Sequence, residues 1–187
     1  MIDELDGSSS TLRLLASQAL KSWTVAGLLN LLLEDDVIVR TSAARELQLR
    51  GGEEAFNRLT QHLCDVRDEV REIAAFTLGQ LGTPEFPFRT RSLLLLLPLA
   101  NDQAACVRAC AAAAIGHLCY DSMSSDAEDV LLRLAKDLDK DVRACAAYAL
   151  SNGRDSPRIR EALATLASDP EEEVRKYADL GSDILGA

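Results

Sequence analysis

Residue types that carry most enzymatic chemistry are scarce in this sequence. Among its 187 residues there are only two histidines, His62 and His117, and they lie far apart in the chain. No HExxH, GxSxG, P-loop or GxGxxG motif occurs, so the sequence indicates none of the sites that these motifs build. We therefore expect no catalytic residue, no cofactor and no enzymatic activity.

Three cysteines and one histidine form the only set that we weigh as a metal site. Cys106 and Cys110 lie one helical turn apart, and Cys110 and Cys145 each stand two residues after an arginine. Together with His117, these thiols could supply zinc ligands. The alternative is that each cysteine replaces an alanine as a small packing residue. We predict on this basis that no metal is bound.

The strongest feature of the sequence is an internal repeat. A Val-Arg pair recurs five times, at intervals of 31 to 37 residues, and an acidic residue stands six positions before each arginine. Alanines follow the first four arginines at the third and fourth positions, and Leu or Ile follows at the seventh. A period of this length is typical of solenoids built from stacked units. The five acid–arginine pairs are Glu34 and Arg40, Asp65 and Arg71, Asp102 and Arg108, Asp137 and Arg143, and Asp169 and Arg175.

Each repeat is expected to contain two helices. The Val, Ala and Leu residues around each arginine share one stripe of a helix, which we name the B helix. An apolar run before each acid predicts an A helix, at residues 23–33, 53–64, 92–100, 127–136 and 157–167. Leu and Ala carry the apolar share and aromatics make up only 4% of the chain, which favours helix over strand. We also expect a capping helix at residues 11–21, and we expect Pro98 to kink or end the third A helix.

The acid-to-arginine spacing, the valine before each arginine and the Ala-Ala-x-x-Leu-Gly run at residues 74–79 resemble HEAT repeats, in the short bacterial form shared with phycobilin lyases. The resemblance extends over about residues 23–187. It implies an all-α fold, a right-handed α-solenoid of about five HEAT-like helix pairs with an N-terminal capping helix. It also implies that the five acids and five arginines form a structural ladder of hydrogen bonds between turns and successive repeats. In this ladder we expect Arg108 with Asp102, and Arg143 with Asp137, to be mostly buried.

Three segments carry a narrower resemblance, to the enterobacterial YibA-type HEAT proteins. They are SAARELQLRGGEEA at residues 42–55, FTLGQL at 76–81 and ACVRA at 105–109. Proteins of this type are encoded in Rhs polymorphic-toxin loci, and the resemblance implies an immunity protein that binds and occludes a toxin domain. The alternative is a phycobilin-lyase-like or other enzyme-associated scaffold.

The B helices offer the surface most suited to a protein partner. Positions two, five and nine residues after each arginine point away from the buried stripe, because successive helical residues are about 100° apart. These positions carry one formal charge, on Arg45, and include aromatic side chains that are frequent interface anchors. The predicted partner-binding residues are Arg45, Ile73, Phe76, Gln80, His117, Tyr148, Asn152 and Tyr177. The alternative is that solenoid curvature and connecting loops cover several of them.

The charge balance limits the classes of partner. The sequence has 30 acidic and 20 basic residues, a net charge of −10. This argues against binding to nucleic acid or to anionic membranes, which need clustered Lys and Arg. Many of the acids fall on the turns between A and B helices. Helix-dipole compensation and solubility explain them, and a docking strip for a basic partner is the alternative.

No segment of the sequence predicts a signal peptide or a membrane span, since the longest leucine run, Leu93–Leu97, stops at Pro98. Five cysteines without a CxxC pair indicate reduced thiols. We therefore expect a cytoplasmic protein that is monomeric when free. We expect a short disordered segment at residues 1–10 and one HEAT-repeat solenoid domain at residues 11–187.

Overall fold

The computed structural model describes residues 3–120, 122–153 and 156–185, and in these ranges it contains helices and turns without β-strands. The predicted all-α, helical-repeat class is therefore confirmed. Contacts divide the chain into two compact units, Met1–Phe88 and Arg89–Ala187, and each unit is described by itself. The single domain at 11–187 stays a prediction.

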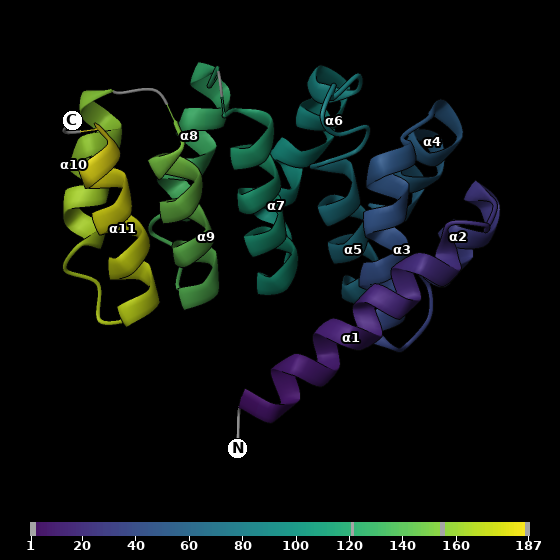
Figure 1. Cartoon of the computed structure of the whole chain (residues 1–187). Coiled ribbons are helices and arrows are strands. Elements are labelled where there is room, and N and C mark those ends of the chain that lie inside the picture. The colour runs from purple at the N-terminus through teal and green to yellow at the C-terminus, as the bar shows by residue number, and fades with distance from the viewer. Residues whose placement is uncertain (1–2, 121, 154–155, 186–187) are drawn as a thin grey trace. The chain divides into compact units, whose positions relative to one another are not determined.

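The first unit consists of two helix pairs and a helix that precedes them. Its helices are α1 (Asp3–Leu20), α2 (Val25–Leu31), α3 (Val37–Arg50), α4 (Glu53–His62) and α5 (Asp68–Leu78) (Figure 1). The A helices α2 and α4 and the B helices α3 and α5 lie where the repeat predicts them. The capping helix α1 packs against α3. It begins at Asp3 rather than at Thr11, because extending a formed helix costs less than starting one; residues 1–2 lie outside the described residues.

Arg50, in the last turn of α3, fixes the C-terminal end of α1. Its Nη2 donates to the main-chain carbonyls of Leu20 (2.9 Å) and Lys21 (2.7 Å). Its Nη1 donates to the carbonyl of Trp23. The charge of Arg50 is balanced by Glu46 at 2.8 Å, a buried carboxylate one helical turn earlier. Because the last carbonyls of a helix have no partner within it, Arg50 satisfies groups that would otherwise need water.

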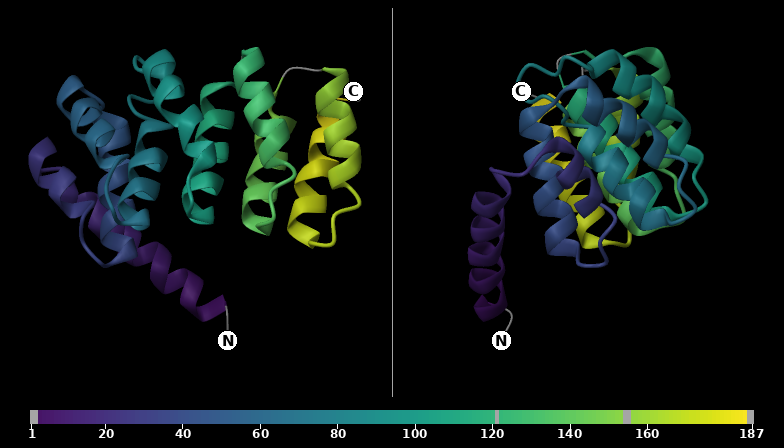
Figure 2. Two further views of the ribbon diagram at one scale, coloured as in Figure 1. Left: turned by 180° about the vertical axis from the view of Figure 1, so that it is seen from behind. Right: turned by 90° about the vertical axis from the view of Figure 1, so that its right-hand side faces the viewer.

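The second unit consists of three helix pairs. They are α6 (Arg89–Leu96) continued by the 3-10 helix η1 (Leu97–Asn101), with α7 (Ala105–Leu118); α8 (Ser125–Leu134) with α9 (Lys140–Ser151); and α10 (Pro157–Leu166) with α11 (Glu172–Leu185). Pro98 ends the third A helix as predicted, since α6 stops at Leu96. The B helices α7, α9 and α11 lie side by side in Figure 1. The A helices of this unit lie on its other side, which Figure 2 shows from behind.

The B helices of the second unit approach one another closely because small residues face each other. A Cβ added at Gly116 of α7 would lie 2.6 Å from the Cβ of Ala149 on α9. A Cβ added at Gly181 of α11 would lie 2.6 Å from the Cβ of Ser151, also on α9. Such contacts leave no room for larger side chains. The three helices therefore form one closely packed layer, and this layer carries the residues of their outer face.

Candidate protein-binding site

Arginines of the second unit hold its successive repeats together. Arg108 on α7 donates from Nε and Nη2 to the two carboxylate oxygens of Asp137, both at 2.8 Å. Arg143 on α9 binds the carboxylate of Asp169 in the same way, at 2.8 and 3.0 Å. These four side chains are only 8–19% exposed. Two parallel bonds between guanidinium and carboxylate are strong and directional, so they fix the register of one repeat on the next.

The pairing within this ladder differs from the expected one. Arg108 reaches Asp102, the acid six residues before it, through a main-chain carbonyl at 2.9 Å, and Arg143 reaches the carbonyl of Asp137 at 3.0 Å. The carboxylate of Asp137 instead binds the arginine of the preceding repeat. Within its own turn, Asp137 also accepts at Oδ1 from the main-chain N–H of Asp139 at 3.0 Å, which holds its carboxylate in place.

Both ladder carboxylates are stabilised in their ionised form. Hydrogen bonds from Arg108 lower the pKa of Asp137, and hydrogen bonds from Arg143 lower the pKa of Asp169. Burial opposes this effect in each case but is the smaller contribution. The pairs therefore remain charged at neutral pH.

The first unit uses the same sequence signature differently. Nη1 of Arg40 donates to the carbonyls of Glu34 (2.7 Å) and Asp35 (2.8 Å), and among the described residues it binds no carboxylate. The carboxylate of Asp65 accepts from the main-chain N–H of Arg67 at 3.0 Å and from its Nε at 3.2 Å. The ladder bond predicted between these two repeats is therefore replaced by a bond within one turn.

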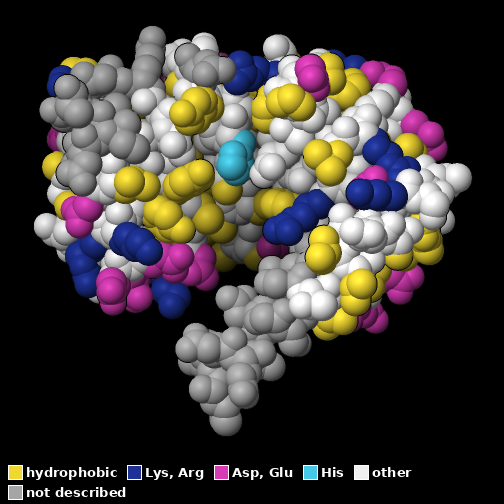
Figure 3. Space-filling model, viewed as in Figure 1, with side chains coloured by type: hydrophobic (Ala, Val, Ile, Leu, Met, Phe, Trp, Pro, Cys, Tyr) yellow, Lys and Arg dark blue, Asp and Glu magenta, His cyan; other side chains and the backbone are white. Residues whose placement is uncertain are grey.

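Three rings form a row across the B helices of the second unit. His117 on α7 meets Tyr148 on α9 edge-to-face, with ring centroids 6.1 Å apart. Tyr148 meets Tyr177 on α11 in the same manner, at 5.5 Å. Each ring is partly exposed, and Figure 3 shows hydrophobic side chains gathered over this face of α7, α9 and α11. We name His117, Tyr148 and Tyr177 the aromatic row; its edge-to-face geometry is a favoured one for rings.

The side chains of His117 and Cys145 on this face are uncharged at neutral pH. Burial lowers the pKa of His117, so its imidazole is neutral. Burial, reinforced by Asp141 and Glu173, raises the pKa of Cys145 to about 11. The Cys145 thiol therefore stays protonated and is a poor nucleophile. This face offers apolar and aromatic contact area rather than reactive groups.

The structure corrects two of the predicted partner-binding residues. Ile73 on α5 is only 7% exposed. The side-chain amide of Asn152 donates to the carbonyl of Tyr148 at 3.0 Å, so it satisfies a carbonyl at the C-terminal end of α9. Ile73 differs because neighbouring elements cover part of the outer face of α5, which the helical-offset argument does not include. Asn152 differs because its amide bonds to a carbonyl of its own helix.

The remaining predicted residues divide between the two units. Arg45 is exposed on α3, and Phe76 and Gln80 are partly exposed on α5 and directly after it, all in the first unit. The aromatic row belongs to the second unit. The structure thus brings three of the predicted partner-binding residues into contact, and these three define the candidate site.

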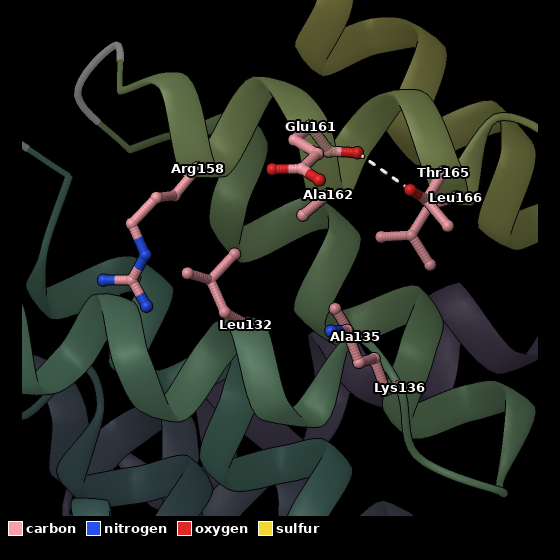
Figure 4. Close-up of a pocket in the computed structure, with 8 residues that line it drawn as sticks. All are labelled: Leu132, Ala135, Lys136, Arg158, Glu161, Ala162, Thr165 and Leu166. Carbon is pink, nitrogen blue, oxygen red and sulfur yellow. Dashed lines mark hydrogen bonds between the residues drawn. The ribbon is translucent and has the colours of Figure 1, made fainter.

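Apart from the aromatic row, the second unit has a hollow of about 230 Å³ between the A helices α8 and α10 (Figure 4). Its lining residues are Leu132, Ala135, Lys136, Arg158, Glu161, Ala162, Thr165 and Leu166. Arg158 is paired with Asp129 at 2.7 Å. The hollow combines an apolar floor with both signs of charge, and no aromatic ring lines it. It is the alternative site in this unit.

In the described residues, no three His, Cys, Asp or Glu side chains are placed to hold a metal ion. Cys106, Cys110 and Cys145 are each partly exposed on the B helices. Within the described part of the chain, no helix is both long and apolar enough to cross a bilayer.

Comparison with known proteins supports the repeat assignment. Residues 93–179 match the family described as HEAT repeats, so the resemblance seen in the sequence is confirmed. A stretch of 93 residues, 49% of this chain, is 37% identical to Protein YibA of Escherichia coli K12. This matched stretch spans 33% of the YibA sequence.

Solved structures share the architecture. The X-ray structure of Escherichia coli YibA is 28% identical and covers 89% of this chain and 72% of its own, with a TM-score of 0.55. The CpcE–CpcF complex of phycocyanin lyase from Nostoc sp. PCC7120 is 24% identical and covers 84% and 97%, with a TM-score of 0.67. A designed armadillo repeat protein in complex with the peptide (KR)4 is 20% identical and covers 98% and 93%, with a TM-score of 0.63. The last two similarities concern the fold alone.

Proposed function

We propose that this HEAT-repeat chain is a noncatalytic protein-binding module whose contact surface is the aromatic row. The observation that carries the proposal is the continuous contact of His117, Tyr148 and Tyr177 across three helices. The Arg108–Asp137 and Arg143–Asp169 pairs hold these helices in register. A partner that crosses the three helices would bury aromatic surface, and preorganised tyrosines are frequent interface hot spots.

We further propose that the partner is an Rhs-type toxin effector domain and that the chain is an immunity protein that occludes it. The identity of 37% to YibA over 93 residues supports this, together with the occurrence of YibA-type proteins in Rhs loci. Occlusion requires only a surface that covers the toxin, which agrees with the absence of catalytic motifs from the sequence. We propose that the chain acts in the cytoplasm and is monomeric until it binds the toxin.

A bilin-handling scaffold is the second candidate function. The similarity to the CpcE–CpcF complex favours it, although this similarity concerns the fold alone. The absorbance spectrum of the purified protein after incubation with a bilin separates the two functions. A new visible band that co-elutes with the protein would support the scaffold, and an unchanged bilin spectrum would support the protein-binding module.

Titration against the toxin domain encoded by the neighbouring gene tests the proposed surface. Truncation of a central anchor ring costs about 2 kcal/mol or more, so we expect a Tyr148→Ala, Tyr177→Ala variant to bind at least about thirtyfold more weakly. Tyr120→Ala is the matched control, since Tyr120 is 67% exposed and lies outside the row, just after α7. Full affinity of the folded double variant would rule out the aromatic row and direct attention to the α8–α10 hollow.

A further inference from the structure

Arg175 on α11 is the last arginine of the ladder series. Its Nη1 donates to the carbonyls of Asp169 and Pro170, both at 2.7 Å. The corresponding nitrogens of Arg108 and Arg143 make the same kind of contact with their own turns. On those two arginines, Nε and Nη2 bind an aspartate of the next repeat. On Arg175, these two donors have no acceptor within the residues that the structure describes.

Arg175 lines a shallow hollow, open to solvent, along the surface of α11. The lining residues are Glu172, Arg175, Lys176, Tyr177, Asp179 and Leu180. Tyr177 is also the last ring of the aromatic row, so the hollow continues the candidate binding surface. Leu180 is exposed and adds apolar area. Since Arg175 and Tyr177 are two residues apart, they lie about 200° apart around α11. A segment that follows the aromatic row reaches Arg175 by continuing from Tyr177 across this hollow.

The surface of α11 carries charges at positions where α9 carries buried alanines. On α9, the positions one and four residues after the ladder arginine hold Ala144 and Ala147, both of which are buried. On α11, the same two positions hold Lys176 and Asp179, which are exposed. Close stacking of another helix would bury both charges, which is unfavourable unless each finds a partner. An extended segment can pass between these side chains and leave them in water.

We propose that Arg175 is a carboxylate anchor for the protein partner: an extended segment of the partner lies along the aromatic row and places an aspartate or glutamate side chain on Nε and Nη2 of Arg175. This inference rests on the proposed function of the aromatic row. The Arg108 and Arg143 pairs show the expected geometry, two parallel bonds of 2.8–3.0 Å. The carbonyls of Asp169 and Pro170 hold the guanidinium before the partner arrives, so binding costs less side-chain entropy.

The charges around Arg175 limit the partner to a single acidic anchor. Glu172 and Asp179 line the same hollow and would repel a second or third carboxylate. The matching segment therefore carries one acidic residue next to aromatic or aliphatic residues that cover Tyr177 and Leu180. Such a segment differs from the basic partner considered above for the acidic turns between A and B helices.

Selection from a random library of 12-residue peptides displayed on phage, with the full chain as bait, tests the anchor. We expect enriched peptides to combine an aromatic or aliphatic residue with one Asp or Glu. In a synthetic copy of the strongest binder, replacing the acid by its amide should weaken binding about tenfold or more, because a charged two-bond contact is lost. The Arg175→Gln variant should bind the acid and amide forms equally.

Two variants control for charge and for folding. Lys176→Gln removes a positive charge from the same hollow and should keep the preference for the acid. Arg175→Lys retains the charge but not the planar pair of donors, and should lose most of the preference. If Arg175→Gln disturbs the turn at Asp169, Arg175→Lys replaces it as the test variant. Circular dichroism of each variant checks the fold.

The outcomes separate the anchor from the binding surface. Peptides that require Tyr148 and Tyr177 but show no preference for an acid would overturn the anchor and leave the proposed function standing. An acid preference that survives in both Arg175 variants would also overturn it. Peptides that bind the Tyr148→Ala, Tyr177→Ala variant at full affinity would contradict the proposed function itself.

Discussion

The two units carry the same acid–Val-Arg signature and form different contacts with it. In the second unit, Arg143 uses one edge of its guanidinium for its own turn and the other edge for Asp169 of the next repeat. In the first unit, Arg40 contacts only the carbonyls of its own turn among the described residues. The signature therefore specifies the turn at both Arg40 and Arg143, and the bond to the next repeat at Arg143 but not at Arg40.

One residue at each turn differs between the two units. The position two residues after the ladder acid is Arg67 in the first unit, and its guanidinium binds Asp65 directly. The same position holds Asp139 and Glu171 in the second unit. These two residues donate only their main-chain N–H, which leaves Asp137 and Asp169 available to the preceding arginine. The side-chain partner of the ladder acid is thus a residue of the same turn at Asp65 and the arginine of the preceding repeat at Asp137 and Asp169.

The largest expected effect is the loss of a ladder arginine in the second unit. Arg143→Ala leaves the carboxylate of Asp169, whose side chain is 8% exposed, without its partner. We expect the free energy of unfolding to fall by about 2–4 kcal/mol. Arg40→Ala is the matched change in the first unit and should cost about 1 kcal/mol, since only hydrogen bonds to exposed carbonyls are lost. Urea denaturation measures both, and equal costs would contradict the difference between the units.

The first unit should depend instead on the arginine that holds its capping helix. Arg50→Ala removes the contacts to Leu20, Lys21 and Trp23 and leaves the buried Glu46 unpaired. We expect a loss of about 1–2 kcal/mol, concentrated in α1. Hydrogen exchange should become faster in α1 and stay unchanged in α9 and α11. Unchanged exchange in α1 would show that its packing on α3 suffices without Arg50.

Acidification should weaken the ladder of the second unit. Hydrogen bonds from arginine lower the pKa of Asp137 and of Asp169 in the folded state, whereas the unfolded value is about 4. Their contribution to stability is therefore fully present above about pH 4 and is lost as the pH falls through the lower folded pKa. Urea midpoints measured from pH 5 downward should show this decline. The decline should be shallower in Arg143→Ala, which already lacks one pair; an identical profile would argue against the ladder as its source.

The smallest expected effect concerns Arg67, which binds Asp65 within its own turn. In Arg67→Gln, the pKa of Asp65 should rise only part of the way to its ordinary value. The main-chain N–H of residue 67, the larger of the two causes of the lowered pKa, remains, while the side-chain bond is lost. Titration of the Asp65 carboxyl carbon by NMR measures the change, with Asp137 as the unchanged reference. A full return to the ordinary pKa would mean that the main-chain bond contributes nothing.

The sequence predicted the helix pairs well because their signals are local. The repeat located all five A helices, and Pro98 marked the end of α6. The ladder residues were recognised, but their pairing was not, because the spacing within one repeat cannot reveal which neighbour a carboxylate faces. Arg67 is visible in the sequence, but its bond to Asp65 could be recognised only from the geometry of the turn.

Long-range packing limited the prediction of the candidate site. Tyr148 and Tyr177 were chosen from helical offsets, and their mutual contact with His117 follows from how α7, α9 and α11 stack. Ile73 has an equivalent offset and is buried. A helical offset gives the direction of a side chain, whereas exposure depends on neighbours that are distant in sequence.

Hydrogen–deuterium exchange of the chain, alone and saturated with the toxin domain encoded by the neighbouring gene, tests most directly whether the aromatic row is the binding surface. Binding across the row should slow exchange in α9 and α11, which carry Tyr148 and Tyr177. The A helices α8 and α10, which line the alternative hollow, should be unaffected. Protection confined to α8 and α10, with α9 and α11 unchanged, would contradict the assignment.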